Sequence, residues 1–316
     1  MPSLSLRVEK VKKLTPRIRQ AILKSENGSA LPTFLPGAHI ELHVPILGDR
    51  QVLRAYSLVN LPSDGFYEIA VQLEDSSSGG SSWVHGLEEG QLIKTEAPNN
   101  HFPLSGVADD VLLIAGGIGI TPILGMARAL RLENRSFTLH YAGREARHMA
   151  YLDEVQEMPE ATCWISSDVT SGRVPLPRVI TAPQPGRHLY VCGPKGLIAD
   201  VLATAEEQGW PKENLHCELF AGSLEAAGEK SFDAELRASG MTLNVPVGQS
   251  LLDVMIDAGL DPIFDCRRGD CGVCVAEVLE GEAEHRDICL SESDRATGSF
   301  CTCVSRARGE RLVLDL

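Results

Sequence analysis

Three closely spaced cysteines near the carboxyl end restrict the fold of this 316-residue chain more than any other feature. Cys266, Cys271 and Cys274 have C-x4-C-x2-C spacing. Gly269 and Gly272 lie between them and let the backbone fold closely over a bound group. Thiolates are soft, strongly donating metal ligands. The loop therefore predicts a metal centre.

The arrangement of this loop favours iron over zinc. Three thiols at this spacing, followed by a distant fourth, are typical of a plant-type 2Fe–2S cluster. Structural zinc prefers paired two-cysteine knuckles to a single loop. A visible absorption spectrum separates the two, because zinc thiolates are colourless. We expect a 2Fe–2S cluster whose first three ligands are Cys266, Cys271 and Cys274.

Position alone leaves the fourth cluster ligand open. Cys289, Cys301 and Cys303 all follow the loop. Cys289 comes only 15 positions after Cys274, which leaves little chain to cross a domain and return. Cys301 and Cys303 differ by two positions, so on a strand both would face the same side.

Composition and charge narrow the class of protein. The nine cysteines are an odd number, and the start of the chain lacks the layout of a signal peptide, which argues against a disulfide framework. A net charge of −14 disfavours nucleic acid or an anionic membrane as a partner. The sequence contains no apolar run of the roughly 18 residues that a transmembrane helix needs. We expect a cytoplasmic protein.

The chain divides into three regions with different patterns. Residues 1–104 contain short apolar runs between turn residues, which predict an antiparallel β-barrel or sandwich. Residues 105–224 alternate strands with helices, which predicts an α/β domain around a parallel sheet. A linker at 225–230 leads to residues 231–316, which hold the cysteine loop.

A glycine-rich loop in the second region predicts a dinucleotide site. The segment 116–122, Gly-Gly-Ile-Gly-Ile-Thr-Pro, joins an apolar strand to a helix. Its small residues let a pyrophosphate approach the positive end of the helix. Thr121 suits the N-cap, and Pro122 suits the first helical turn. Because Pro122 replaces the third glycine of a Rossmann fingerprint, a glycine-rich turn without a ligand is the alternative.

A second turn in this region, Cys192-Gly193-Pro194, ends a later strand of the same predicted sheet. Ligands of such sheets bind at the carboxyl ends of the strands. Cys192 by itself is more often a small buried apolar residue.

A strand in the first region carries residues suited to a phosphorylated aromatic ligand. In Arg54-Ala55-Tyr56-Ser57-Leu58, we expect the Arg, Tyr and Ser to share one strand face. Arg holds phosphate by two parallel hydrogen bonds, whereas Tyr and Ser suit the face and the edge of a ring. The segment 79–82, Gly-Gly-Ser-Ser, precedes a predicted helix at 82–87 and offers a second anion site. Ordinary strand surface is the alternative.

Together these motifs resemble the phthalate dioxygenase reductase family of the ferredoxin–NADP reductase superfamily, over essentially the whole chain. The resemblance implies an FMN-binding β-barrel at 1–104, an NAD-binding domain at 105–224 and a β-grasp ferredoxin domain at 231–316. The residues that match the family's flavin motifs are Arg54, Ala55, Tyr56, Ser57, Gly79, Gly80, Ser81, Ser82, Glu218 and Phe220. Those that match its nicotinamide motifs are Gly117, Gly119, Thr121, Pro122, Cys192, Gly193 and Pro194.

The resemblance also implies a function. FMN, NADH and a 2Fe–2S cluster would be the cofactors, and a separate Rieske-type non-haem iron oxygenase would accept the electrons. Such oxygenases include aromatic-acid dioxygenases and O-demethylases. Ser57, Cys192 and Glu218 would line the catalytic junction where hydride passes from nicotinamide to flavin. The sequence around Cys303 matches that around the family's last cluster ligand, which selects Cys303.

The preferred nucleotide and the final acceptor are less closely determined. Asp168 follows a predicted strand at 163–166, where an acidic group would bond ribose hydroxyls and repel a 2′-phosphate. An ordinary loop aspartate is the alternative. Two other functions stay open, namely a redox-sensing or electron-wire subunit of another complex, and a reductase that serves a haem oxygenase. The oxygenase selects the final substrate, which this sequence therefore does not reveal.

Overall fold

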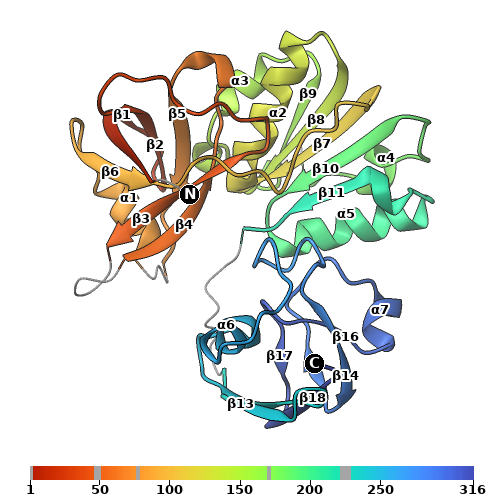
Figure 1. Cartoon of the computed structure of the whole chain (residues 1–316). Coiled ribbons are helices and arrows are strands. Elements are labelled where there is room, and N and C mark those ends of the chain that lie inside the picture. Colours follow the sequence, from red (N-terminus) through yellow and green to blue (C-terminus); the bar gives the residue numbers. More distant parts are fainter. Residues whose placement is uncertain (1–2, 46–50, 76–78, 169–171, 221–228) are drawn as a thin grey trace. The chain divides into compact units, whose positions relative to one another are not determined.

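The computed structural model describes residues 3–45, 51–75, 79–168, 172–220 and 229–316 (Figure 1). The chain forms two compact units, residues 1–218 and residues 219–316. Within the described ranges, no helix has the length and apolar character needed to cross a membrane.

Six antiparallel strands form the first sheet, in the order β4-β3-β6-β1-β2-β5. Its outer strands β4 and β5 also contact each other, so the sheet curls into a barrel. The strands are β1 Leu4–Thr15, β2 Ile18–Ser25, β3 His39–Pro45, β4 Gln51–Ser57, β5 Tyr67–Gln72 and β6 Leu92–Thr95, with a 3-10 turn η1 at Pro62–Asp64 and the helix α1 at Gly80–His85.

The second sheet of the first unit is fully parallel, in the order β11-β10-β7-β8-β9. Its central strand β7 is buried throughout its apolar run, as expected of a parallel sheet covered on both faces. The strands are β7 Asp110–Gly116, β8 Ser136–Gly143, β9 Ala161–Ile165, β10 Arg187–Cys192 and β11 Leu215–Glu218.

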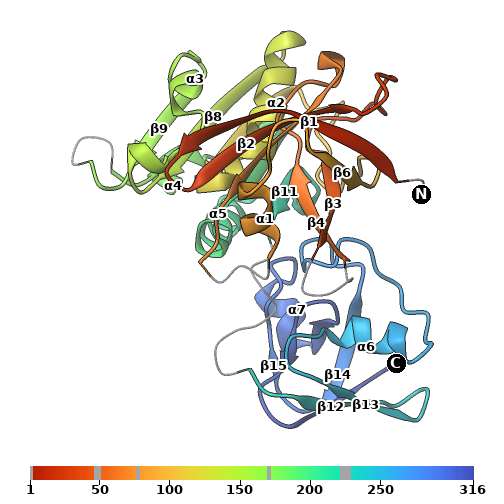
Figure 2. The same ribbon diagram turned by 90° about the vertical axis from the view of Figure 1, so that its left-hand side faces the viewer.

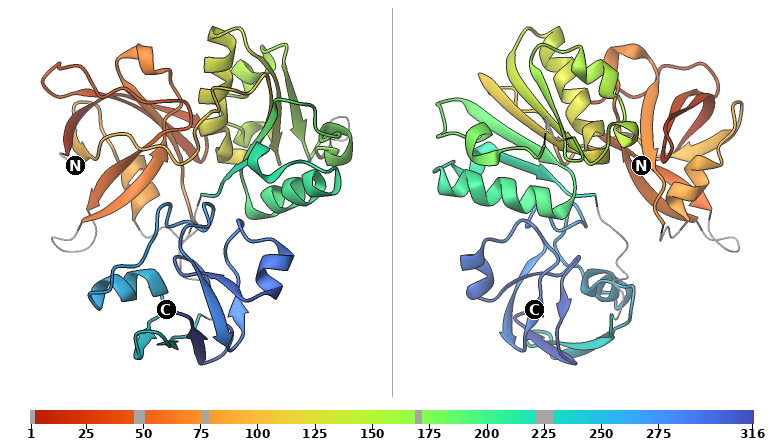
Figure 3. Two further views of the ribbon diagram at one scale, coloured as in Figure 1. Left: turned by 45° about the vertical axis from the view of Figure 1, so that its right-hand side comes forward. Right: turned by 180° about the vertical axis from the view of Figure 1, so that it is seen from behind.

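Helices connect these parallel strands and cover them. Helix α2 packs on β7, β8 and β10, α3 on β9, and α5 on β10. Figure 3 shows α2, drawn in yellow, beside the orange strands of the antiparallel sheet. The helices are α2 Ile120–Leu132, α3 Leu152–Gln156, α4 Leu176–Val179 and α5 Lys195–Glu207, with 3-10 turns η2 Gly117–Gly119, η3 Ala146–His148 and η4 Lys212–Asn214.

The second unit is a mixed sheet with a helix packed against it, which is the β-grasp arrangement. The sheet order is β13-β12-β18-β14-β16, and β12 and β18 are parallel. Figure 2 shows the hairpin of β12 and β13. Ser239-Gly240 lies in its turn. The elements are β12 Phe232–Leu236, β13 Met241–Val245, α6 Leu251–Asp257, β14 Val275–Glu280, β15 Ala283–Glu284, α7 Glu292–Ala296, β16 Ser299–Cys301, β17 Arg306–Ala307 and β18 Arg311–Leu314.

The predicted fold class is confirmed: an antiparallel barrel, a parallel α/β sheet and a C-terminal β-grasp follow one another along the chain. The first four residues of the predicted linker at 225–230 lie outside the described residues. Helix α6 begins directly after Ser250, whose hydroxyl accepts a hydrogen bond from the Asp253 amide at 3.0 Å.

Candidate functional site

The glycine-rich loop leaves β7 at the carboxyl edge of the parallel sheet. The N-cap of α2 is Gly119, so the prediction that Thr121 is the N-cap is wrong. The turn η2 starts the helical path early, which places Thr121 inside the first turn. There its hydroxyl donates to the Ile118 carbonyl at 3.0 Å and steadies the loop. Pro122 lies in the first helical turn, as predicted.

The Cys192-Gly193-Pro194 turn lies directly against this loop. A Cβ atom on Gly119 would stand 2.3 Å from the Cys192 carbonyl oxygen, so only glycine permits this approach. Cys192 pairs with Glu218 in the neighbouring strand, and both residues are buried. The structure thus brings Gly119, Cys192 and Glu218 to one edge of the sheet, and Pro194 then caps α5.

The Arg54 to Ser57 segment forms the end of β4. Arg54 and Tyr56 are half-buried and alternate with the exposed Ala55. Ser57 follows Tyr56 directly and therefore points to the opposite side, so the prediction that all three share one face is wrong. Ser57 is nevertheless buried, at the point where the strand ends.

The Gly79 to Ser82 segment reaches this strand. A Cβ atom on Gly80 would lie 3.0 Å from Cγ of Arg54 and 3.1 Å from the Tyr56 hydroxyl. Burial raises the pKa of Tyr56 to about 12, so its phenol stays a neutral hydrogen-bond donor. The guanidinium of Arg54 and the nearby backbone of Gly80 suit a phosphate, and the neutral phenol of Tyr56 suits an aromatic ring next to it.

This segment does not simply precede a helix, as the sequence predicted, because α1 already begins at Gly80. Gly79 is the N-cap, and the serines lie inside the helix. Ser81 is buried and accepts a hydrogen bond from the Glu74 amide at 3.1 Å, whereas Ser82 is exposed.

The remaining predicted site residues lie at element ends. Asp168 is exposed in the turn after β9, the edge strand of the parallel sheet, and its amide donates to the Ile165 carbonyl at 2.9 Å. Phe220 follows β11 and is half-buried.

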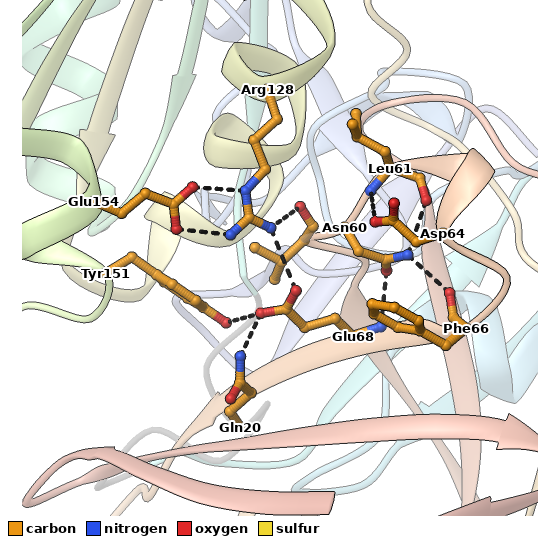
Figure 4. A network of polar contacts seen from close by, with 10 residues as sticks. Gln20, Asn60, Leu61, Asp64, Phe66, Glu68, Arg128, Tyr151 and Glu154 are labelled. Atoms are coloured by element: carbon orange, nitrogen blue, oxygen red, sulfur yellow. Dashed lines mark hydrogen bonds and ion pairs between the residues drawn. The ribbon is translucent and has the colours of Figure 1, made fainter. Parts of the chain in front are cut away.

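Sequence reasoning missed a polar network that joins the two sheets of the first unit. Arg128 of α2 bonds to Glu68 of β5 and to Glu154 of α3 (Figure 4). The only signal in the sequence is a charged residue inside each of two otherwise apolar runs, which an ordinary surface position also produces.

The thiols of the cysteine loop gather in the second unit. Cys266, Cys274 and Cys303 are buried, and Cys271 is exposed. A hydrogen bond with Cys303 lowers the pKa of Cys266 to about 3, despite burial. Bonds to Cys266 and Cys274 raise the pKa of Cys303. Cys303 therefore reaches two of the loop thiols at once, and this donor set fits a sulfur-rich iron cluster.

Cys301 shares the neighbour Cys274 with Cys303, but its second neighbour is Cys289 and not Cys266. Its thiol bonds to Cys274, which raises its pKa, and its Sγ lies 3.4 Å from Sγ of Cys289. Strand β16 ends at Cys301, and Cys303 lies in the turn that follows. The two residues therefore do not share a strand face, so the expectation that both would face the same side of a strand is wrong.

Comparisons with known proteins agree with this domain order. Residues 234–308 match the family model for a 2Fe-2S iron-sulfur cluster binding domain. Residues 92–215 match the N-terminal domain of proteins similar to the dimethylamine monooxygenase subunit DmmA.

Similar proteins match nearly the whole chain. The heme-dependent oxidative N-demethylase beta subunit of Ectopseudomonas mendocina is 38% identical over 99% of both chains. The vanillate O-demethylase oxidoreductase of Pseudomonas sp. strain HR199 is 37% identical over 92% of both. The solved structure of phthalate dioxygenase reductase, described as a modular structure for electron transfer from pyridine nucleotides to [2Fe-2S], is 32% identical. It has a TM-score of 0.74 and covers 99% of this chain and 98% of its own.

Proposed function

Because this chain belongs to the phthalate dioxygenase reductase family of oxygenase reductase components, we propose that it oxidises NADH and passes the electrons through FMN and a 2Fe–2S cluster to a separate Rieske-type oxygenase. An aromatic-acid dioxygenase or O-demethylase is the acceptor class that we propose. The relative named vanillate O-demethylase oxidoreductase supports this choice.

The observation that carries the proposal is that one chain holds two kinds of redox site. The first unit places a glycine loop, Cys192 and Glu218 at the edge of a parallel sheet. The second unit gathers cysteine thiols within the region that matches a 2Fe-2S domain. A sensor would need only one of these sites.

We assign the flavin to the first unit. Arg54 would hold the phosphate, with the backbone of Gly79 and Gly80 beside it, and Tyr56 would lie against the ring. When bound, a flavin converts the two-electron chemistry of NADH into the single-electron steps that an iron–sulfur cluster accepts. Ser57, Cys192 and Glu218, which are all buried, would line the junction where hydride passes from nicotinamide to flavin.

We assign the cluster ligands as Cys266, Cys271, Cys274 and Cys303. The contacts of Cys303 with both Cys266 and Cys274 support its choice as fourth ligand. The partnership of Cys301 with Cys289 makes Cys301 the weaker candidate.

We also propose three domains, at 1–104, 105–224 and 231–316, joined by a linker at 225–230. The distribution of the strands supports these boundaries. All strands of the antiparallel sheet lie before residue 96, and all strands of the parallel sheet lie between 110 and 218. The mixed sheet begins at 232.

Replacing Arg54 by alanine should weaken FMN binding by about 1.5–3 kcal/mol, because a charged hydrogen bond to phosphate is lost. Equilibrium titration of the flavin-free protein with FMN measures this change. Arg7→Ala, on an exposed position of β1, is the control and should bind FMN normally. If both variants bound FMN with equal affinity, Arg54 would not be a phosphate ligand. Stoichiometric FAD in the purified protein would refute FMN as the flavin.

NADH should be preferred over NADPH, as measured by kcat/KM, because the carboxylate of Asp168 would repel a 2′-phosphate. Asp168→Asn should narrow the preference, whereas Asp153→Asn, on α3, should leave it unchanged. If the unchanged protein used both nucleotides equally, the assignment of Asp168 to the ribose site would fail.

A haem-containing oxygenase is the second candidate for the partner. The relative named heme-dependent oxidative N-demethylase beta subunit, which matches over 99% of the chain, favours it. Capture of the partner with the reduced chain as bait, followed by haem and iron analysis, separates the candidates. Iron without haem supports a Rieske-type partner, and haem supports the alternative.

Steady NADH oxidation by the isolated chain tests the proposed activity itself. The reconstituted protein should reduce a dye or cytochrome acceptor over many turnovers. A redox sensor or electron-wire subunit would not sustain NADH oxidation by itself.

A further inference from the structure

A partly buried ion-pair network lies between the antiparallel barrel and the parallel sheet. Arg128 of α2, whose side chain is only 21% exposed, meets carboxylates from two other elements. Its Nε and Nη2 donate to the two oxygens of Glu154, each at 2.8 Å. Its Nη1 donates to Glu68 at 3.3 Å and to the Val59 carbonyl at 2.9 Å (Figure 4). Four of its five N–H donors are therefore used.

Glu68 completes the network from the barrel side. This carboxylate is buried on β5 and accepts hydrogen bonds from Tyr151 at 2.8 Å and from Gln20 at 2.5 Å. Its backbone amide donates to the Asn60 side chain at 2.8 Å. The network thus ties α2, α3 and the N-cap of α3 to two strands of the barrel.

The segment that Arg128 holds continues directly from the Arg54 to Ser57 strand. Val59 lies two residues after Ser57, and its amide donates to the Glu68 carbonyl at 2.9 Å. Close packing adds to these bonds, because a Cβ atom on Gly125 would lie 3.1 Å from the Leu58 carbonyl oxygen. The middle of α2 is therefore fastened to the end of this strand.

The other end of α2 begins at the glycine-rich loop 117–119. The same rigid helix thus carries the nucleotide loop at its start and the barrel contact one to two turns later. We propose that Arg128 is a positioning residue that sets the spacing between the flavin strand and the nicotinamide loop. This inference rests on the proposed function.

The chemistry explains why such spacing matters. Hydride transfer requires the reacting atoms at about 3–3.5 Å, and a displacement of about 1 Å costs on the order of a hundredfold in rate. A planar guanidinium fixes two directions at once, whereas lysine offers a single flexible ammonium. Arg128→Lys therefore keeps the partly buried charge but loses the fixed geometry.

The test compares Arg128→Lys with Arg131→Lys, the same change one turn later in α2. The side chain of Arg131 is 46% exposed and reaches Glu160 only at 4.0 Å. In anaerobic rapid mixing at saturating NADH, Arg128→Lys should lower the limiting rate of flavin reduction at least tenfold. Flavin occupancy and the apparent Kd for NADH should stay within twofold. The long-wavelength absorbance of nicotinamide stacked on flavin should weaken.

A second readout uses the flavin-free protein. Hydrogen exchange of the Val59 amide should be faster in Arg128→Lys than in Arg131→Lys, because the hydrogen bond from Arg128 to the Val59 carbonyl is lost or weakened. The proposal requires both the lower limiting rate of flavin reduction and the faster exchange of the Val59 amide. A limiting rate equal to that of the unchanged protein, unaltered exchange at Val59, or a rate that falls only in proportion to lost flavin would each overturn it. Failure of the unchanged chain to react with NADH would instead refute the proposed function.

Discussion

Cys303→Ser should abolish the visible and electron-paramagnetic signals of the 2Fe–2S cluster, while reduction of the flavin by NADH survives. A serine hydroxyl is a harder and weaker donor to iron than a thiolate. The thiol of Cys303 also contacts Cys266 and Cys274 together, so its loss removes the side chain that closes the site. Absorbance and paramagnetic resonance of the reconstituted protein measure the result.

Cys301→Ser is the matched control for this prediction. The substitution is chemically identical, and the residue lies two positions earlier in a buried environment. Its Sγ faces Cys289 at 3.4 Å, so the cluster should remain. If Cys301→Ser lost the cluster and Cys303→Ser kept it, Cys301 would be the fourth ligand. The proposed electron route from NADH through flavin to the cluster would be unaffected.

Gly119→Ala should raise the KM for NADH at least tenfold, equivalent to about 1.4 kcal/mol of lost binding. The added methyl would lie 2.3 Å from the Cys192 carbonyl oxygen and 2.6 Å from the Gly193 nitrogen. Both atoms belong to the backbone, so relief requires the loop and the neighbouring turn to separate. Steady-state kinetics with a dye acceptor, together with flavin occupancy, measure the effect.

Gly196→Ala provides the control for that variant. Gly196 lies in α5 just after the same turn, and an added Cβ would meet no atom within 4 Å. Its KM should be unchanged, and its stability should rise slightly because alanine favours a helix. If Gly119→Ala bound NADH as tightly as Gly196→Ala, the contact between loop and turn would have no role in nucleotide binding.

The sequence predicts the fold well where the pattern is local. The apolar run of β7, the cysteine loop and the Ser239-Gly240 hairpin each follow from neighbouring residues, and the structure has them as expected. Local patterns predict the helix starts less well. The N-cap of α2 is Gly119 and not Thr121, because the 3-10 turn η2 starts the helical path before the expected position. Residue propensities for the N-cap do not indicate this turn.

The site is predictable only in part, for a physical reason. Arg54 and Cys192 can be picked out from the sequence, because each lies in a short motif of neighbouring residues. Arg128 and Glu68 carry only a signal that an ordinary surface charge also gives, because their role depends on two residues that are 60 positions apart and meet only after folding. The choice between Cys301 and Cys303 likewise depends on where β16 ends, which spacing does not reveal.

Anaerobic addition of one equivalent of NADH to the reconstituted chain tests the central claim most directly. Visible absorbance follows the flavin, and low-temperature paramagnetic resonance follows the cluster. We predict that both centres gain electrons in the unchanged protein and that only the flavin bleaches in Cys303→Ser. A cluster that stays oxidised in the unchanged protein, or that is reduced equally fast in flavin-free protein, would contradict a route from NADH through flavin to 2Fe–2S.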